Sequence, residues 1–251
     1  MDPSRLEITT LADRPDRMPL TAQLDDPGVA PFLYQDPVST ALFADLVARH
    51  PAYTLLAVER DSGRPAAMVC TMPFTATDPL PAGGYDAVLL SAAADTLAGR
   101  RGNAVSALFA TVRPDLRNRG LSAAMLDAGR RNAARLGHAA LLAPVRPTRK
   151  HRHPDVPMAE YVTWRRPDDT AADPWVRVHE RAGGRFVAVA DHSMTVTAGL
   201  DRWRDWTGLP FDTEGPVVVP GGLVPVRCEP TRGIATYIEP NAWFRHDLGG
   251  S

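Results

Sequence analysis

The feature that most constrains this chain is the stretch Val112–Leu126, which reads VRPDLRNRGLSAAML. An apolar run ends at Val112, a proline follows, and an Arg-x-x-Gly-x-Ser turn over 117–122 leads directly into an amphipathic helix. A turn of this kind aims successive backbone N–H groups and the positive end of the helix dipole at an anion, and Gly120 leaves room for a close approach. The sequence therefore predicts a phosphate-binding strand-turn-helix.

Two common nucleotide-binding motifs do not fit this turn. The dinucleotide fingerprint needs Gly-x-Gly-x-x-Gly and the P-loop needs Gly-Lys-Ser/Thr, and the turn contains neither. It resembles instead the pyrophosphate loop of the GNAT superfamily of acyl-CoA-dependent N-acyltransferases, Gln/Arg-x-x-Gly-x-Gly/Ala, with Arg117, Gly120 and Ser122 at the three specified positions. Ser122 replaces the usual small apolar residue, but serine is small and suits a helix N-terminus. The alternative is a solvated surface loop.

Composition limits the domain count and the kinds of partner. The chain has 251 residues, 44% of them hydrophobic, which favours one domain with an elaboration. A formal net charge of −1 supplies no overall basic field, so we expect no nucleic-acid partner. No apolar run reaches the roughly 20 residues of a membrane span, so we expect a soluble, cytoplasmic protein without a membrane partner. Cys70 and Cys228 are too few and too far apart for a disulfide framework.

Hydrophobic periodicity predicts an α/β order of elements. The expected strands cover 5–11, 53–60, 64–74, 104–112, 138–145 and 185–196, and the expected helices cover 38–50, 121–136 and 173–182. A strand, a crossover helix and another strand imply a parallel pair. The order matches the GNAT fold over residues 5–197, which implies a mixed sheet with flanking helices and a splayed central parallel strand pair.

The same comparison predicts how the domain is divided. We expect a GNAT acyltransferase core over 1–197, with a polar, proline-rich insertion near 146–174. Long ordered loops are usually functional, so the insertion is a place to look for site residues. Residues 198–251 are then a C-terminal extension packed on the same domain.

The resemblance implies an acyl-CoA as co-substrate, and we expect acetyl-CoA. Main-chain groups at the end of the strand would pair with the pantetheine arm, and the turn would hold the pyrophosphate. The implied cofactor-binding residues are Ala110, Thr111, Val112, Arg117, Asn118, Arg119, Gly120, Leu121 and Ser122.

Acyl transfer to an amine needs a base for the amine's proton and an acid for the leaving thiolate. The family often uses a carboxylate near the central strands and a tyrosine on the short helix. Here 105–112 contains no Asp or Glu, and the tyrosine position in HERAGGRF is His179. His179 is thus the expected general acid, with Tyr161 of the insertion as a spare proton donor. The alternative for His179 is packing beside the glycine turn, and the base is left open.

The acceptor side is expected in the tail. YIEPNAWFRH gathers aromatic side chains around Glu239 and Asn241, which we expect to contact the acceptor, and Glu160 of the insertion is a further candidate. The alternative is that the tail aromatics only attach the extension to the sheet. His151 and His153 have Asp155 as their one acidic neighbour at supporting spacing, so no metal site is expected.

Together these patterns predict an enzyme that transfers an acyl group from acetyl-CoA or another acyl-CoA to a small-molecule amine by direct attack in a ternary complex. The missing strand carboxylate keeps open a GNAT-like acyl-thioester decarboxylase or an O-acyltransferase. A non-catalytic CoA-binding sensor or interaction protein is the third hypothesis. The acceptor, the acyl chain and the presence of a homodimer also stay open.

Overall fold

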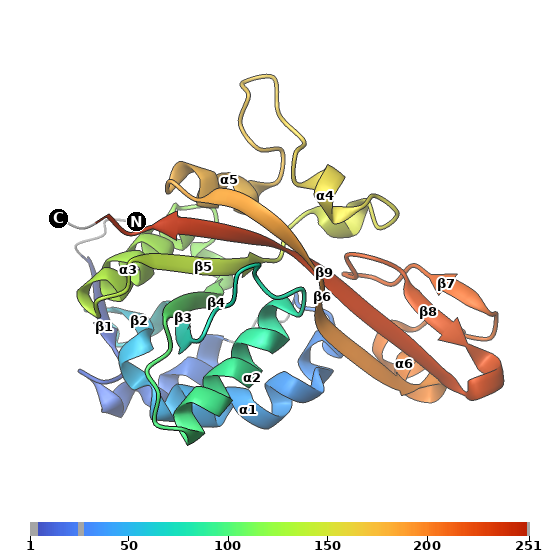
Figure 1. Ribbon diagram of the computed structural model, residues 1–251, viewed down its shortest axis with the longest axis horizontal. Helices are drawn as coiled ribbons and strands as arrows, with labels where there is room; N and C mark the ends of the chain where they lie inside the picture. The colour runs from blue at the N-terminus through green and yellow to red at the C-terminus, as the bar shows by residue number, and fades with distance from the viewer. Residues whose placement is uncertain (1–4, 25–27, 250–251) are drawn as a thin grey trace.

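The computed structural model describes residues 5–24 and 28–249, which form one nine-stranded mixed sheet (Figure 1). Hydrogen-bonded neighbours follow the order β1-β2-β3-β4-β5-β9-β8-β7, and β6 pairs with β9 off that path. The strands are β1 (Leu6–Thr10), β2 (Thr54–Glu59), β3 (Pro65–Phe74), β4 (Ala104–Val112), β5 (Ala140–Val145), β6 (Arg185–Gly199), β7 (Gly215–Val217), β8 (Val226–Glu229) and β9 (Ile234–Asp247). The expected mixed α/β sheet is confirmed.

Helices cover both faces of this sheet. The longer ones are α1 (Pro37–Arg49), α2 (Gly84–Leu97) and α3 (Leu121–Arg135). The shorter ones are α4 (Met158–Tyr161), α5 (Pro174–Arg181) and α6 (Leu200–Thr207). The 3₁₀ helices are η2 (Pro15–Leu24), η3 (Pro31–Gln35), η4 (Pro51–Tyr53), η5 (Pro114–Leu116), η6 (Lys150–Arg152) and η7 (Pro230–Arg232). Among the described residues, no helix combines the length and the apolar character needed to cross a bilayer.

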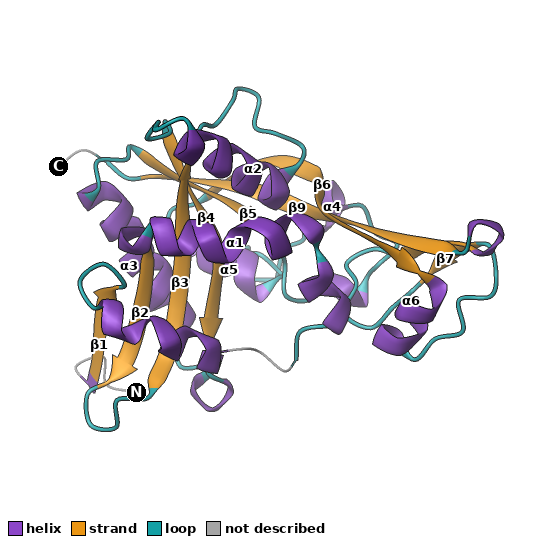
Figure 2. Cartoon of the chain, turned by 90° about the horizontal axis from the view of Figure 1, so that it is seen from below, coloured by secondary structure: helices purple, strands orange, loops and turns teal. Residues whose placement is uncertain are grey.

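Strand β3 shows how the two layers arise. All of it is buried, and its side chains alternate between the faces. Met68 and Met72 join the core cluster under α1 and α2, the face seen in Figure 2, whereas Ala67 and Val69 join the cluster under α3. A continuous apolar strand of this kind is typical of a sheet covered on both sides.

Helix α2 is absent from the sequence prediction, which placed no element between 85 and 103. Its N-cap residue, Gly83, offers no capping side chain, and small apolar residues occur all around the helix. Val88, Leu89 and Ala92 nevertheless face the core and pack beside α1. Tertiary packing therefore stabilises a helix that has no start signal in its sequence.

The central parallel pair separates after a short contact. Strands β4 and β5 pair only at Val105 with Leu141 and at Ser106 with Leu142. A bulge in β4, opposite the Cys70–Thr71 step of β3, follows at once, and bulges bend a strand. Among the described residues, the edge of β4 over 107–112 therefore has no strand partner on the β5 side. The splayed central pair is confirmed.

Strand β9 belongs to two parts of the molecule. Its residues 242–247 lie between β5 and β6 in the main sheet, while residues 234–239 pair with the far half of β6 and with β8 (Figure 1). Trp203 and Tyr237 are fully buried in the core of the extension, and Trp243 is buried in the main core. Trp203 and Tyr237 therefore build the core of the extension itself, whereas Trp243 packs in the core of the main sheet. The division of the chain after residue 197 stays a prediction. Strand β9 lies beyond that point and still pairs with β5 in the main sheet, so the core and the extension share one sheet.

Candidate active site

The turn before α3 has the backbone geometry that an anion site needs. Asn118 and Gly120 have φ angles of 61° and 78°, and Gly120 is the N-cap of α3 with no side chain capping the helix. The first turn's bond runs from Ala124 N to Gly120 O at 3.1 Å, and the N–H groups before it have no partner inside the helix. A Cβ added at Gly120 would meet no protein atom within 4 Å, so within the protein itself the glycine is needed for its positive φ, while its role in a close approach of the anion stays a prediction.

The arginines near this turn differ in what they contact. The Arg113 side chain is 11% exposed, and its guanidinium forms ion pairs with Glu59 and Asp115, each with an N–O distance of 2.7 Å. Arg117 directs Nε at the carbonyl oxygen of Val112 at 3.4 Å, and Arg119 is exposed beside it. The turn therefore has two arginines near its backbone donors, while the third belongs to the β2–β3 side.

The nine predicted cofactor-binding residues lie along one path. The first three form the end of the unpaired β4 edge, and the other six form the turn and the start of α3. Thr111 Oγ1 donates to the carbonyl oxygen of Leu24 at 3.2 Å, so η2 closes one side of this path. Coenzyme binding by these residues stays a prediction that this geometry supports.

His179, the predicted general acid, is buried between α5 and β9. Its Nδ1 lies 2.9 Å from Nε2 of His246, and its ring lies edge-on to Trp175 at 4.7 Å. Burial lowers the pKa of His179 to about 3, with the neighbouring His246 as a smaller cause, and burial lowers the pKa of His246 to about 4. Both rings are therefore neutral at pH 7. The acid role of His179 stays a prediction, and the packing role fits this environment better.

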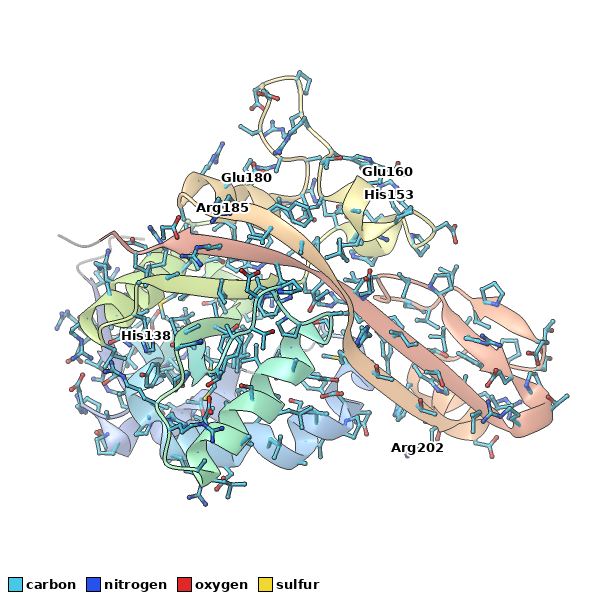
Figure 3. The ribbon with its side chains drawn as sticks, in the orientation of Figure 1. His138, His153, Glu160, Glu180, Arg185 and Arg202 are labelled. Carbon is cyan, nitrogen blue, oxygen red and sulfur yellow. The ribbon has the colours of Figure 1, made fainter. Side chains whose placement is uncertain are left out.

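Tyr161, the spare proton donor, is also buried. Its hydroxyl donates to Asp173 Oδ2 at 3.1 Å, and burial followed by the Asp173 charge raises the pKa of Tyr161. Asp173 in turn caps α5 by accepting from Trp175 N and Val176 N. The catalytic role of Tyr161 stays a prediction, since its hydroxyl is already committed to this cap. Glu160 is exposed on α4, above the sheet in the view of Figure 3 and away from α1 and α2.

Glu239 and Asn241 lie in a buried polar cluster at the irregular stretch of the β6–β9 pairing, between the Ala190–Asn241 and Met194–Glu239 pairs. Glu239 is 1% exposed and accepts from Arg146 Nε at 3.0 Å through both oxygens, from Tyr237 Oη at 2.7 Å and from Asn241 Nδ2 at 3.1 Å. Asn241 Oδ1 accepts from Ser193 Oγ at 2.6 Å. The structure thus brings Glu239 and Asn241 together but not Glu160, and their contact with an acceptor stays a prediction.

This cluster lies at the same edge of the sheet as the turn. Arg146 is the first residue after β5, and the turn follows β4, so both come at the carboxyl ends of the central parallel strands. The carboxyl edge of open α/β sheets, where strand order changes, is where ligands usually bind. The edge therefore presents backbone donors for an anion on one side and charged side chains on the other.

Two further carboxylates at this edge were missed by the sequence prediction. Asp36 caps α1 by accepting from Ser39 N at 2.6 Å, and Asp86 lies in the first turn of α2. Burial raises both pKa values, and burial followed by the Asp36 charge raises that of Asp86 to about 8. The Asp-Pro-Val-Ser string is a helix-start signal for Asp36, but α2 itself was not predicted, so nothing marked Asp86. Among the described residues, no three His, Cys, Asp or Glu side chains are grouped to hold a metal ion.

Comparison with known proteins agrees with this geometry. No protein-family model matches the chain. It is 33% identical over 276 aligned residues to the arginine N-acetyltransferase avaD of Aspergillus versicolor, covering 98% of this chain and 95% of that protein. Two solved structures share its fold: the loading GNATL domain of CurA from Lyngbya majuscula (TM-score 0.60, 15% identity, 97% and 96% of the two chains covered) and the GphF GNAT-like decarboxylase in complex with isobutyryl-CoA (0.54, 16%, 98% and 100%). A relative of this identity over nearly the full length, on this fold, shows that the chain belongs to the GNAT superfamily and is a GNAT-type N-acyltransferase.

Proposed function

We propose that this chain transfers the acetyl group of acetyl-CoA to an amino group of a small molecule, with free arginine as the acceptor. The observation that carries the proposal is the unpaired edge of β4 running into the uncapped N-terminus of α3. A full-length relative whose name states arginine N-acetylation supports the choice of acceptor.

The coenzyme half rests on backbone chemistry. The pantetheine arm carries amides that fit, as a further strand would, the edge of β4 over 107–112, which has no strand partner on the β5 side among the described residues. The pyrophosphate fits the positive φ pair at Asn118 and Gly120 together with the helix dipole of α3. Arg117 and Arg119 add positive charge at that point.

The reaction is a direct attack within a ternary complex. The neutral acceptor nitrogen attacks the thioester carbonyl carbon and the C–S bond breaks. The nitrogen then loses one proton and the leaving CoA thiolate gains one, so the products are the neutral amide and the free CoA thiol. A covalent acyl-enzyme is disfavoured because burial raises the pKa of Cys70 to about 12 and also raises that of Cys228. Both thiols are buried and protonated, whereas an activated thiol nucleophile is an accessible thiolate.

Release of the free CoA thiol tests the proposal. Purified protein is incubated with acetyl-CoA and a panel of arginine, lysine, agmatine, tyramine and buffer alone, and the product is identified by mass. We expect thiol release and acetylarginine with arginine, and intersecting initial-rate lines as a ternary complex requires. Parallel lines would indicate an acyl-enzyme instead.

Two other outcomes would replace the proposal. Release of carbon dioxide from malonyl-CoA without an amine would favour the acyl-thioester decarboxylase. Tight acetyl-CoA binding with no thiol release for any acceptor or acyl-CoA would favour the sensor. Gly120→Val, which is expected to lose coenzyme binding, is the control that assigns each signal to this site.

A further inference from the structure

Two carboxylates from different helices, Asp36 and Asp86, contact one another beside the backbone of Thr195 in β6, without a cation. Asp36 is fully buried at the start of α1, and Asp86 is partly exposed at the start of α2. One oxygen of Asp36 accepts from Ser39 N at 2.6 Å. The Oδ1 atoms of Asp36 and Asp86 are both buried and have no hydrogen-bond partner. In the described part of the chain, neither acid has an ion-pair partner.

The carboxylate of Glu239, in contrast, has both a cationic partner and neutral hydrogen-bond donors. It accepts bonds from Arg146, Tyr237 and Asn241, and Arg146 is held there by Gly221 O as well. The charge of Arg146 is therefore paired with Glu239, and among the described residues no ion pair joins Arg146 to Asp36 or Asp86. Leaving two carboxylates buried without a counter-charge is costly, so a pair of this kind either retains a proton or receives a cation.

We propose that Asp36 and Asp86 form the subsite for the guanidinium group of the acceptor, with one oxygen of each carboxylate accepting a guanidinium N–H. This rests on the proposed function and specifies how the acceptor is recognised. A guanidinium has five N–H donors in a rigid planar fork, and two carboxylate oxygens from separate side chains match that fork. A neutral urea group of the same shape would lack the charge that the pair requires.

The arrangement of the two helices defines the approach. Asp36 is fully buried and Asp86 is partly exposed, so the proposed approach of a cation is from the Asp86 side of the pair. Tyr85, the residue before Asp86, bonds Ser39 on α1 at 3.1 Å through its hydroxyl, and its N–H donates to Ser193 Oγ at 2.8 Å. Ser193 also donates to Asn241 Oδ1, so the Asp pair and the Glu239 cluster are held in one network.

Binding at this pair has a protonation signature. Burial and the Asp36 charge raise the pKa of Asp86 to about 8, with Glu239 as a smaller contributor, so the unliganded pair holds a proton at pH 7. The other groups facing the pair are Tyr85, whose pKa burial raises, and Glu239, which Arg146 neutralises. A bound guanidinium stabilises both charges and expels the shared proton. Arginine binding should therefore release protons, and its affinity should rise from pH 6 toward pH 8.

Calorimetry on the full chain loaded with CoA tests the subsite directly. Arginine, agmatine and the neutral analogue citrulline are titrated in buffers of different ionisation enthalpy. We expect arginine and agmatine to bind at least about tenfold more tightly than citrulline, the scale of one charged hydrogen bond, and to release protons. Asp86→Asn and Asp36→Asn should each remove that preference and the proton release while leaving acetyl-CoA affinity unchanged. Asparagine preserves the α1 cap, and Asp45→Asn on the outer face of α1 is the matched control.

The outcomes separate this subsite from the enzymatic proposal. If arginine binds and displays the charge preference but no thiol is released, the subsite stands and the proposed function fails. If arginine is acetylated while both Asn variants keep the arginine-to-citrulline ratio, the subsite is wrong and the pair only shares a proton between two helices. Failure of wild-type protein to bind arginine or agmatine also overturns the subsite.

Discussion

At the end of β4 the candidate coenzyme site consists of backbone N–H groups around Gly120, whereas at the end of β5 the polar cluster consists of buried charged side chains. The first is exposed and its donors have no partner within α3. The second is buried, and Glu239 alone accepts from three different side chains. Both lie at the same edge of one sheet.

This difference determines how each side responds to mutation. A site made of backbone groups depends on φ and ψ, so it tolerates changed side chains and fails when a turn is forced out of conformation. A cluster of buried charges depends on the identity of each partner, because removing one leaves the other unpaired. Mutations in the candidate coenzyme site should therefore weaken binding more than stability, and mutations in the polar cluster at the end of β5 should lower stability first.

Arg146→Ala should produce the largest effect. Glu239 is 1% exposed and Arg146 about one-third exposed, so the substitution leaves a buried carboxylate without its cation. Breaking such a pair costs about 3–5 kcal/mol of unfolding free energy. Denaturant unfolding measures the loss. The control Arg245→Ala removes an exposed pair with Asp247 and should cost less than about 1 kcal/mol. Equal losses of unfolding free energy in the two variants would mean that the buried pair with Glu239 is no more important for stability than an exposed ion pair.

Gly120→Val tests the backbone side. A side chain at φ 78° strains the turn, although nothing stands within 4 Å of the added Cβ. We expect acetyl-CoA affinity to fall about a hundredfold, roughly 3 kcal/mol, because the N–H groups no longer converge. Gly63→Val is the matched control, since Gly63 has φ 69° and equally open surroundings in the β2–β3 turn. If both variants bind acetyl-CoA normally by calorimetry, the turn is not the coenzyme site.

The same contrast explains which half of the site could be predicted from sequence. The Arg-x-x-Gly-x-Ser turn is local: its residues are consecutive, and its conformation follows from one glycine and the start of one helix. The strands on either side of it were predicted for the same reason, since β3, β4 and β5 are apolar runs bounded by turn residues.

The proposed acceptor side could not be assembled from the sequence, because its residues come from distant segments of the chain. Asp36 and Asp86 face one another only after α2 packs on α1, and α2 has no sequence start signal. Glu239 was singled out from the sequence as an acceptor contact, which stays a prediction, and its ion pair with Arg146 forms only because β9 inserts beside β5. His179 matched a motif position, yet the sequence did not reveal that His246 would lie against it.

The pH dependence of stability sharpens the comparison, because it reports on buried side chains and not on backbone. The folded-state pKa values of about 3 for His179 and about 4 for His246 lie below the ordinary value of about 6.5. The unfolded chain therefore takes up protons first as the pH falls, so stability is complete above about pH 6.5 and is lost toward pH 4. At pH 5, His246→Asn should recover on the order of 2 kcal/mol of that loss. Urea unfolding of wild type and His246→Asn at pH 7 and pH 5 measures this. An equal loss of unfolding free energy between the two pH values in both proteins would contradict it.

Tyr161→Phe should have the smallest effect, and it separates a structural hydroxyl from a proton donor. The substitution removes one hydrogen bond to Asp173, which still accepts from Arg149 N at 2.8 Å and Trp175 N at 2.9 Å. Because the Asp173 carboxylate keeps these hydrogen-bond partners, the loss of unfolding free energy should be about 1 kcal/mol. Turnover should stay close to wild type. Thermal unfolding and the thiol-release assay measure the two quantities on the same preparation. A proton donor to the leaving thiolate would show the reverse pattern, with turnover falling about a hundredfold at unchanged stability and unchanged coenzyme affinity. That result would restore Tyr161 to the catalytic role predicted from the sequence and would mean that the α4 segment opens toward the end of β5 during the reaction.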